Sequence, residues 1–262
     1  GKGYPNTFKN ETEEYNGTSW SEQSNVTTAR TTSGSGTQTA GLIFGGTNGA
    51  PGSTGVQTLT EEYNGASWTN GGVLSTARLN IYGAGTQTAS FSAGGYAATD
   101  TSVTTVEDYN GTSWTSSTAM PTAQNGGGTA GLPSARLVFG GYGPYSNLTW
   151  EGDGEGWTAS GNMIQARGIF AGFGSQTDAI AAAGSVNPNV NSALVEGYDG
   201  TAWSTRPSVA TARMAFVPSG SYNTTTGGYI AGGSLQGNPM SNATEEWTAQ
   251  TAAVNIETLT TS

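Results

Sequence analysis

An eight-residue motif returns along this chain at a nearly constant spacing, and a repeat of this kind limits the possible folds more than any other sequence feature. The motif reads Glu-Glu-Tyr-Asn-Gly-Thr-Ser-Trp at residues 13–20, and close copies occupy 61–68 and 107–114. Altered copies follow at 150–157 and 196–203, and a sixth begins at Glu245 and then diverges. Successive tryptophans of the first five copies are 43 to 48 residues apart. The chain is therefore predicted to consist of repeated structural units of that length.

Two further features recur at fixed places in each unit. The tenth residue after each tryptophan follows an alanine and is arginine in four units, and an apolar run then ends in a glycine pair, as at residues 42–46. The repeated tryptophans are Trp20, Trp68, Trp114, Trp157 and Trp203, and the repeated cations are Arg30, Arg78, Arg167 and Arg213, with Gln124 in the third unit. Each unit thus has four strand-length segments, named a (after the arginine), b (ending in the glycine pair), c (Glu-Glu-Tyr) and d (around the tryptophan).

Asn-Gly between segments c and d predicts a tight β-hairpin, since both residues tolerate positive φ. Four antiparallel strands in about 46 residues, repeated along a chain, are typical of the blades of a β-propeller. No amphipathic stretch of helical period interrupts them. We predict an all-β fold, with one β-propeller domain over residues 1–262 and repeat units at 11–46, 47–95, 96–141, 142–184, 185–233 and 234–262.

The order of glycine pair, Glu-x-Tyr-Asn, Trp and distal Arg resembles the kelch repeat over residues 11–250. That resemblance implies four-stranded antiparallel blades and a recognition face formed by the b–c and d–a loops. The wording of the motif, with Gly-Thr-Gln-Thr-Ala at 36–40 and 85–89, is also similar to kelch-like arrays in virion structural proteins of tailed phages. The chain departs from the pattern at Gln124, at Gly152 in the tyrosine position and at Ala183 in the glycine pair.

The number of blades depends on how the N-terminal residues are used. The chain has six c segments and five glycine-pair segments, so it begins midway through a unit. Six blades are favoured, with five complete ones and a half-blade from residues 11–22 that upstream residues of a longer chain complete. Alternatively, this hairpin pairs with the last a and b strands and closes a ring of five, which leaves residues 254–261 over.

Composition excludes several kinds of chemistry. The chain has no Cys and no His, so we expect no disulfide, thiol nucleophile, imidazole base, metal or cofactor. The net charge of −10 disfavours nucleic acid as a partner. No apolar run reaches the length of a bilayer span, so membrane insertion is not expected. Asp153-Gly154-Glu155 offers oxygen ligands for calcium but lacks the usual loop pattern.

The repeated charged and aromatic residues have a functional and a structural interpretation. The arginines form either an anion-binding ring or ties from blade to blade, and their fixed spacing favours ties. Adjacent residues of a strand face opposite ways, so one glutamate of each pair is expected to face the arginine and the other solvent, rather than forming a catalytic pair. The tyrosines and tryptophans either stack on sugar rings or pack between blades, and packing is favoured.

The loops between segments b and c differ most in length from unit to unit. They are residues 47–56, 96–102, 142–147, 185–191 and 234–242, and a further insertion at 219–227 separates a and b of the last unit. Tyrosine and asparagine give adaptable contacts at low entropic cost, and binding residues concentrate on loops. The candidate binding residues are therefore Tyr96, Tyr142, Tyr145 and Asn189.

Three functions are open. The first is a non-enzymatic protein of a tailed-phage virion, displayed on tail, fibre or capsid, which contacts other virion proteins or a host surface glycan or protein and forms homo-oligomers on the particle. The second is a secreted propeller that binds or cleaves carbohydrate. The third is a kelch module for protein interactions. The first is favoured, because the motif wording is similar to virion proteins and most catalytic residue types are absent.

Overall fold

The computed structural model describes residues 2–3, 7–50, 55–188, 190–214, 227–237 and 239–248. Within these ranges the chain forms short antiparallel strands and no α-helix, as predicted. The same residues contain no helix with the length and apolar character needed to cross a membrane. The chain divides into two compact units, Gly1–Ala123 and Gln124–Ser262, each of which is described by itself.

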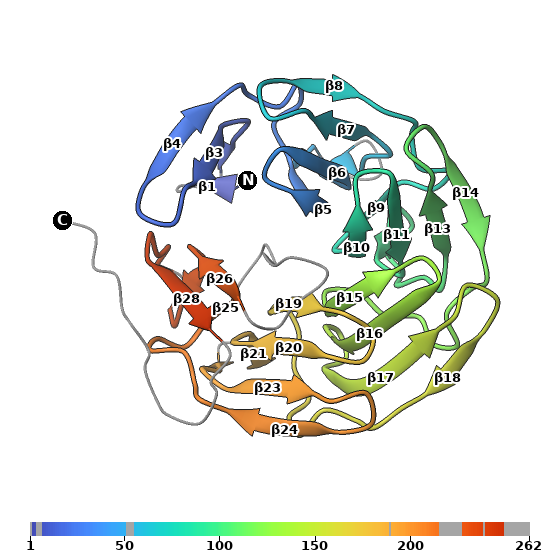
Figure 1. The fold of residues 1–262 in the computed structure, drawn as a ribbon, viewed down its shortest axis with the longest axis vertical. Helices are drawn as coiled ribbons and strands as arrows, with labels where there is room; N and C mark the ends of the chain where they lie inside the picture. The colour runs from blue at the N-terminus through green and yellow to red at the C-terminus, as the bar shows by residue number, and fades with distance from the viewer. Residues whose placement is uncertain are drawn as a thin grey trace. The chain divides into compact units, whose positions relative to one another are not determined.

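The first unit contains strands β1 to β14. Their bounds are β1 (Lys2–Gly3), β2 (Thr7–Phe8), β3 (Thr12–Tyr15), β4 (Trp20–Gln23), β5 (Thr31–Thr37), β6 (Ala40–Thr47), β7 (Thr60–Tyr63), β8 (Trp68–Asn70), β9 (Arg78–Leu79), β10 (Tyr82–Thr86), β11 (Ala89–Ala93), β12 (Tyr96–Ala97), β13 (Val106–Tyr109) and β14 (Trp114–Ser117). Two four-stranded blades have the orders β5-β6-β7-β8 and β10-β11-β13-β14, and the hairpin β3-β4 precedes them (Figure 1). The short pairs β1-β2 and β9-β12 accompany these sheets.

The second unit contains strands β15 to β28. Their bounds are β15 (Gly128–Leu132), β16 (Ala135–Gly141), β17 (Ser146–Gly152), β18 (Trp157–Ala159), β19 (Ala171–Gly174), β20 (Ala179–Ala182), β21 (Ser185–Asn187), β22 (Val190–Asn191), β23 (Val195–Tyr198), β24 (Trp203–Arg206), β25 (Arg213–Met214), β26 (Gly227–Ala231), β27 (Ser234–Leu235) and β28 (Thr244–Thr248). Two blades again have four strands, in the orders β15-β16-β17-β18 and β19-β20-β23-β24, and the pairs β21-β22, β25-β27 and β26-β28 accompany them (Figure 1).

Each complete blade uses the predicted segments in the order a, b, c, d, and its c–d turn forms as the sequence predicts. In the blade β5–β8, the Oδ1 of Asn64 accepts the backbone N–H groups of Ala66 and Ser67 at 3.0 and 2.9 Å. Gly65, which follows Asn64, has a φ of +87°, a conformation that glycine adopts at little cost. The Asn-Gly pair therefore fixes the register in which Tyr63 lies opposite Trp68.

The interior of both units repeats one packing arrangement between consecutive blades. Phe44 on β6 is fully buried and its ring centroid lies 4.8 Å from that of Trp114 in the next blade. Phe139 on β16 is equally buried and meets Trp203 of its next blade at 4.8 Å. Burial of a phenylalanine contributes about 1.5–3 kcal/mol, so these contacts are a main source of cohesion between blades.

Four of the five predicted complete blades are present in full. In the fifth, β26 and β28 supply segments b and c, with Ile230 opposite Glu245 as Ile43 is opposite Glu61. Segments a and d of this blade are predicted at residues 215–226 and after 248, which lie outside the described residues, as do the predicted remainder 254–261 and most of the insertion 219–227. A ring of five requires the N-terminal hairpin to pair with β26, at the edge where β28 pairs instead. The structure therefore does not support that alternative.

Candidate functional site

Each repeated arginine is buried and forms an ion pair with the first glutamate of segment c in its own blade. Arg78 and Glu107 have fully buried side chains, and Nη2 lies 2.8 Å from Oε1. The same pair is formed by Arg30 with Glu61, Arg167 with Glu196 and Arg213 with Glu245. The Nη1 of Arg78 also donates to the carbonyls of Gly94 and Thr105 at 2.6 and 3.0 Å. Burial closes these guanidinium groups to anions from solvent, so they belong to the framework.

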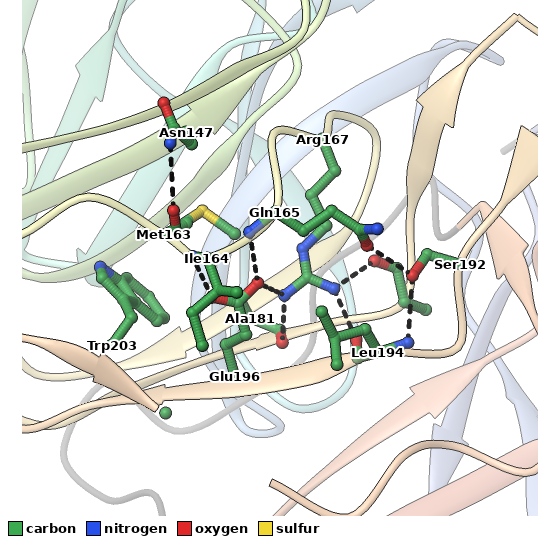
Figure 2. A network of polar contacts seen from close by, with 12 residues as sticks. Asn147, Met163, Ile164, Gln165, Arg167, Ala181, Ser192, Leu194, Glu196 and Trp203 are labelled. Atoms are coloured by element: carbon green, nitrogen blue, oxygen red, sulfur yellow. Dashed lines mark hydrogen bonds and ion pairs between the residues drawn. The ribbon is translucent and has the colours of Figure 1, made fainter. Parts of the chain in front are cut away.

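Figure 2 shows the arrangement around Arg167. Its guanidinium donates to three backbone carbonyls and, at 3.0 Å, to the Oε1 of Glu196. The Oε2 of Glu196 accepts the backbone N–H of Ile164 at 2.6 Å. Burial lowers the pKa of Arg167 to about 10, against the opposing effect of the Glu196 charge. The loop that contains Ile164 leads from segment d of one blade to segment a of the next. The pair therefore holds this loop against the c strand of the next blade.

The arginine bonds stay within one blade, which differs from the prediction that they tie one blade to the next. Because the arginine stands immediately before segment a, its side chain reaches segments b and c of the same sheet. Arg30, for example, donates to the carbonyl of Gly45 on β6 and to Glu61 on β7. The predicted structural role of the arginines holds, as does the expectation that one glutamate of segment c faces the arginine, and only the expectation that these bonds cross from blade to blade is wrong.

Consecutive blades are joined instead by the tyrosine and tryptophan of the motif and by a glutamine in the a–b turn. Tyr63 donates its hydroxyl to Glu14 of the preceding hairpin at 2.7 Å, and the Nε1 of Trp68 donates to Thr12 at 2.9 Å. The Nε2 of Gln87 donates to the carbonyl of Tyr63 in the preceding blade at 2.7 Å. In the second unit, Trp203, Gln176 and Tyr198 make the equivalent bonds.

The second glutamate of the motif was predicted to face solvent, which holds for the exposed Glu246 but not where the structure describes a following blade. Glu62 and Glu151 are half-buried, and each accepts a hydrogen bond from a tyrosine of the following blade, Tyr109 and Tyr198. The alternation of a strand gives the face on which the side chain lies but not the neighbour that covers that face. Burial, followed by the bond to the carboxylate, raises the pKa of both tyrosines to about 12. These carboxylates are thus engaged in the framework rather than paired for acid–base catalysis.

The acidic run at residues 153–155 is a hairpin turn. The Oδ1 of Asp153 accepts the backbone N–H groups of Gly156 and Glu155 at 2.7 and 2.9 Å, and these bonds lower the pKa of Asp153. Asp199 makes the same two bonds in its own turn. In the part of the chain that the structure describes, no three His, Cys, Asp or Glu side chains are grouped so that they hold a metal ion.

A pocket of about 300 Å³ lies among the b–c loops of the second unit. Its described lining comes from the loop after β16, from the β21–β22 loop and from the turn after β27. Tyr142 and Tyr145 belong to this lining, and their ring centroids lie 5.3 Å apart at an interplanar angle of 86°. Tyr142 is 37% exposed, so part of its side chain is open to a ligand.

Two of the four predicted binding residues thus lie together. Asn189 lies outside the described residues, and its neighbours Pro188 and Asn191 line the pocket. Tyr96 belongs to the first unit, where it is half-buried on β12 opposite Leu79. The sequence reasoning missed Ile169 and Met214, which line the pocket from the segments that follow Arg167 and Arg213.

Tyr142 is held in place through its backbone. Its N–H donates to the carbonyl of Asn125 at 2.7 Å, and the Nδ2 of Asn125 donates to the carbonyl of Tyr142 at 2.9 Å. Gly168 permits a close approach from the other blade, since a Cβ there would lie 2.7 Å from the Cβ of Tyr142. The neighbouring Tyr145 is fixed by a 2.9 Å bond between its hydroxyl and Ser185.

Ile169 lines the same pocket in a strained conformation. Its φ is +53°, in the left-handed region that β-branched residues rarely adopt, and such strain costs on the order of 1–3 kcal/mol. The equivalent positions of two other blades hold Asn80 and Gly126, with φ of 51° and 63°, and both residue types tolerate this region. The backbone N–H of Ile169 donates to the carbonyl of Gly126 at 2.6 Å, which holds the conformation. Strain of this kind is typical of functional sites.

Comparison with protein-family models gives no match to this chain, and comparison with curated proteins gives none either. Among solved structures, the chain is similar to the one titled "Structure of YjhT", with a TM-score of 0.75 and 12% sequence identity. The similarity covers 97% of this chain and 98% of that chain. The chain folds as a β-propeller. At this identity the similarity concerns the fold alone, and it confirms the architecture predicted from the repeat.

Proposed function

We propose that this chain is a non-enzymatic recognition propeller, carried on the particle of a tailed phage, whose b–c loops in the second unit bind a component of the host surface. The observation that carries this proposal is the pocket that contains Tyr142 and Tyr145. It lies among the b–c loops, whose length differs most from one repeat to the next. Asn125 bonds the backbone of Tyr142, and Ser185 bonds the hydroxyl of Tyr145. Binding sites commonly consist of such loops on a rigid framework.

Recognition is favoured over catalysis by the chemistry of the pocket. Its ten described lining residues include no carboxylate, and the chain has no His or Cys. A glycosidase of the usual kind needs two carboxyl groups at the bond that it cleaves. In the four complete blades, the glutamates of segment c are instead bonded to arginine or tyrosine, as with Glu61 and Glu62.

The virion setting is supported by the sequence wording of the repeat, which is similar to kelch-like arrays of tailed-phage structural proteins. It implies contacts with other virion proteins and with the host, and repeated copies of the chain on one particle. Gold-labelled antibody against the chain is therefore expected to decorate intact particles. Particles that carry no label after permeabilisation would exclude this setting.

Binding of the fluorescently labelled chain to a panel of bacterial cells tests the recognition function. We expect flow cytometry to detect binding to particular strains and a loss of that binding in the double variant Tyr142→Ala/Tyr145→Ala. Thr69→Ala is the control, because Thr69 is exposed on the edge strand β8 of the first unit, and it is expected to bind as the original chain does. Binding that the double variant retains in full contradicts the proposal, as does turnover of any chromogenic glycoside.

A further inference from the structure

We propose, on the basis of the recognition function above, that the pocket selects an uncharged pyranose ring of a surface glycan and discriminates against acidic sugars. Three independent observations lead to this ligand class: the absence of charge around the pocket, the fixed tyrosine pair, and the neutral amide groups beside it.

The first observation is the charge of the segments that contribute to the pocket. None of its ten described lining residues carries a charged side chain. The described residues of the three loop segments, 137–150, 179–188, 190–195, 227–237 and 239–244, contain no Asp, Glu, Lys or Arg. Arg167 and Arg213, which precede the lining residues Ile169 and Met214, are buried and paired with glutamates of segment c. A carboxylate or phosphate in the pocket would lose its hydration without gaining a cationic partner, which is strongly unfavourable. The pocket therefore favours a neutral ligand.

The second observation is the tyrosine pair. Tyr142 and Tyr145 lie nearly perpendicular to each other, with the backbone of Tyr142 bonded to Asn125 and the hydroxyl of Tyr145 bonded to Ser185. A rigid aromatic ring offers a large apolar contact at low entropic cost and has a polar hydroxyl at its end. A pyranose has the complementary surface, with a face of C–H bonds and a rim of hydroxyl groups.

The third observation concerns the polar groups that accompany these rings. The backbone N–H of Asn191 donates to the Oε1 of Gln236 at 3.0 Å, and the Nδ2 of Asn191 donates to the carbonyl of Ser234 at 2.9 Å. These bonds connect two of the loops and hold both amides at the pocket. Primary amides donate and accept hydrogen bonds without charge, which suits the hydroxyl groups of a neutral sugar.

The size and the conformation of the pocket agree with a single ring. Its volume of about 300 Å³ is at the small end of the range for small-molecule sites. Ile169 keeps its strained φ of +53° at the pocket although asparagine and glycine occupy the equivalent positions of two other blades. An apolar β-branched side chain at this point provides contact area that asparagine or glycine does not.

The test is a printed array of neutral and acidic oligosaccharides, followed by calorimetry with the strongest neutral and the strongest acidic ligand. We expect binding to neutral glycans, with an affinity that hardly changes with salt, because no charged pair forms. Tyr142→Ala is expected to weaken binding about tenfold or more, whereas Tyr142→Phe keeps the ring and changes affinity by less than about threefold. Thr69→Ala, on the exposed edge strand β8, serves as the control and is expected to leave the affinity unchanged.

The possible outcomes separate this inference from the proposed function. Preference for sialylated or uronic-acid glycans, or an affinity that falls steeply with salt, overturns the inference. Cell binding that requires Tyr142 and Tyr145 but disappears after protease treatment of the cells, with no glycan bound, also overturns it and leaves the recognition function standing. Binding to glycans and cells that is insensitive to both tyrosines overturns the two proposals together.

Discussion

Gln124 and Trp150 occupy, in the blade β15–β18, the two positions that hold a buried ion pair in the other blades. Gln124 is the tenth residue after Trp114, and Trp150 lies opposite Val138 as Glu61 lies opposite Ile43. The Nε2 of Gln124 donates instead to the Oγ of Ser146 at 2.8 Å. Both charges are absent together, and this agrees with the physics of buried pairs, since a single buried charge without its partner is far less stable than none.

This relationship predicts the behaviour of the intact pair Arg78–Glu107. Arg78→Gln leaves the buried Glu107 without its cation and is expected to lower the free energy of unfolding by about 3–5 kcal/mol. Adding Glu107→Gln removes the remaining charge and is expected to recover part of this loss. Urea denaturation followed by tryptophan fluorescence measures both variants. A double variant no more stable than the single one would show that the uncompensated charge is not the cause.

Tyr109 and Tyr198 predict a loss of stability in alkali. Their folded pKa is raised to about 12 from an ordinary 10, because burial and the adjacent glutamate disfavour the phenolate. A raised pKa of this kind contributes stability that is fully present below pH 10 and disappears as the pH rises through 12. Absorbance titration of the folded chain is expected to show tyrosines that ionise late, and Tyr109→Phe/Tyr198→Phe is expected to reduce that late component, to which Tyr63 and Tyr229 also contribute. Ionisation of every tyrosine near pH 10 without unfolding would contradict this interpretation.

Glu61 predicts a loss of stability in acid. Burial acts to raise its pKa, but the bonds from Arg30 and from the Thr27 N–H outweigh burial and hold that pKa below the ordinary 4.5. A lowered pKa contributes stability that is present above pH 4.5 and is lost as the pH falls through the folded value. Glu61→Gln is expected to be less stable at neutral pH and to lose less on acidification. Urea midpoints measured at neutral pH and at about pH 3 test this difference.

Ile169 and Asn80 occupy equivalent left-handed positions in different blades and permit a reciprocal exchange. Asn80→Ile places a β-branched residue at positive φ and is expected to cost about 1–2 kcal/mol, whereas Ile169→Asn removes that strain and is expected to leave stability equal or higher. If Ile169 serves the ligand, Ile169→Asn also weakens glycan binding. Thermal unfolding and calorimetry of the two variants measure these effects. A marked loss of stability in Ile169→Asn would show that the conformation is not strained.

Features that depend on neighbours in the sequence were predictable. The c–d turn at Asn64 and Gly65 forms as expected, because the preference of these residues for positive φ is local. Tyr142 and Tyr145 were proposed as candidates from the variable b–c loops, and both line the pocket. The prediction that Glu62 faces solvent was wrong, because Tyr109 of another blade covers it. The pocket itself was not predictable, since three loops and the φ of Ile169 define it, and no single segment carries that information.

The bonds that the repeated tyrosine, tryptophan and glutamine make between blades have a direction along the chain, and this affects how the protein forms. Tyr63, Trp68 and Gln87 are donors in the later blade, and their acceptors belong to the earlier one. Domains synthesised on the ribosome fold from the N-terminus, so each new blade that emerges meets acceptors that are already in place. The repeat therefore favours an order of assembly from the first blade to the last, in which each folded blade provides the acceptors for the next one.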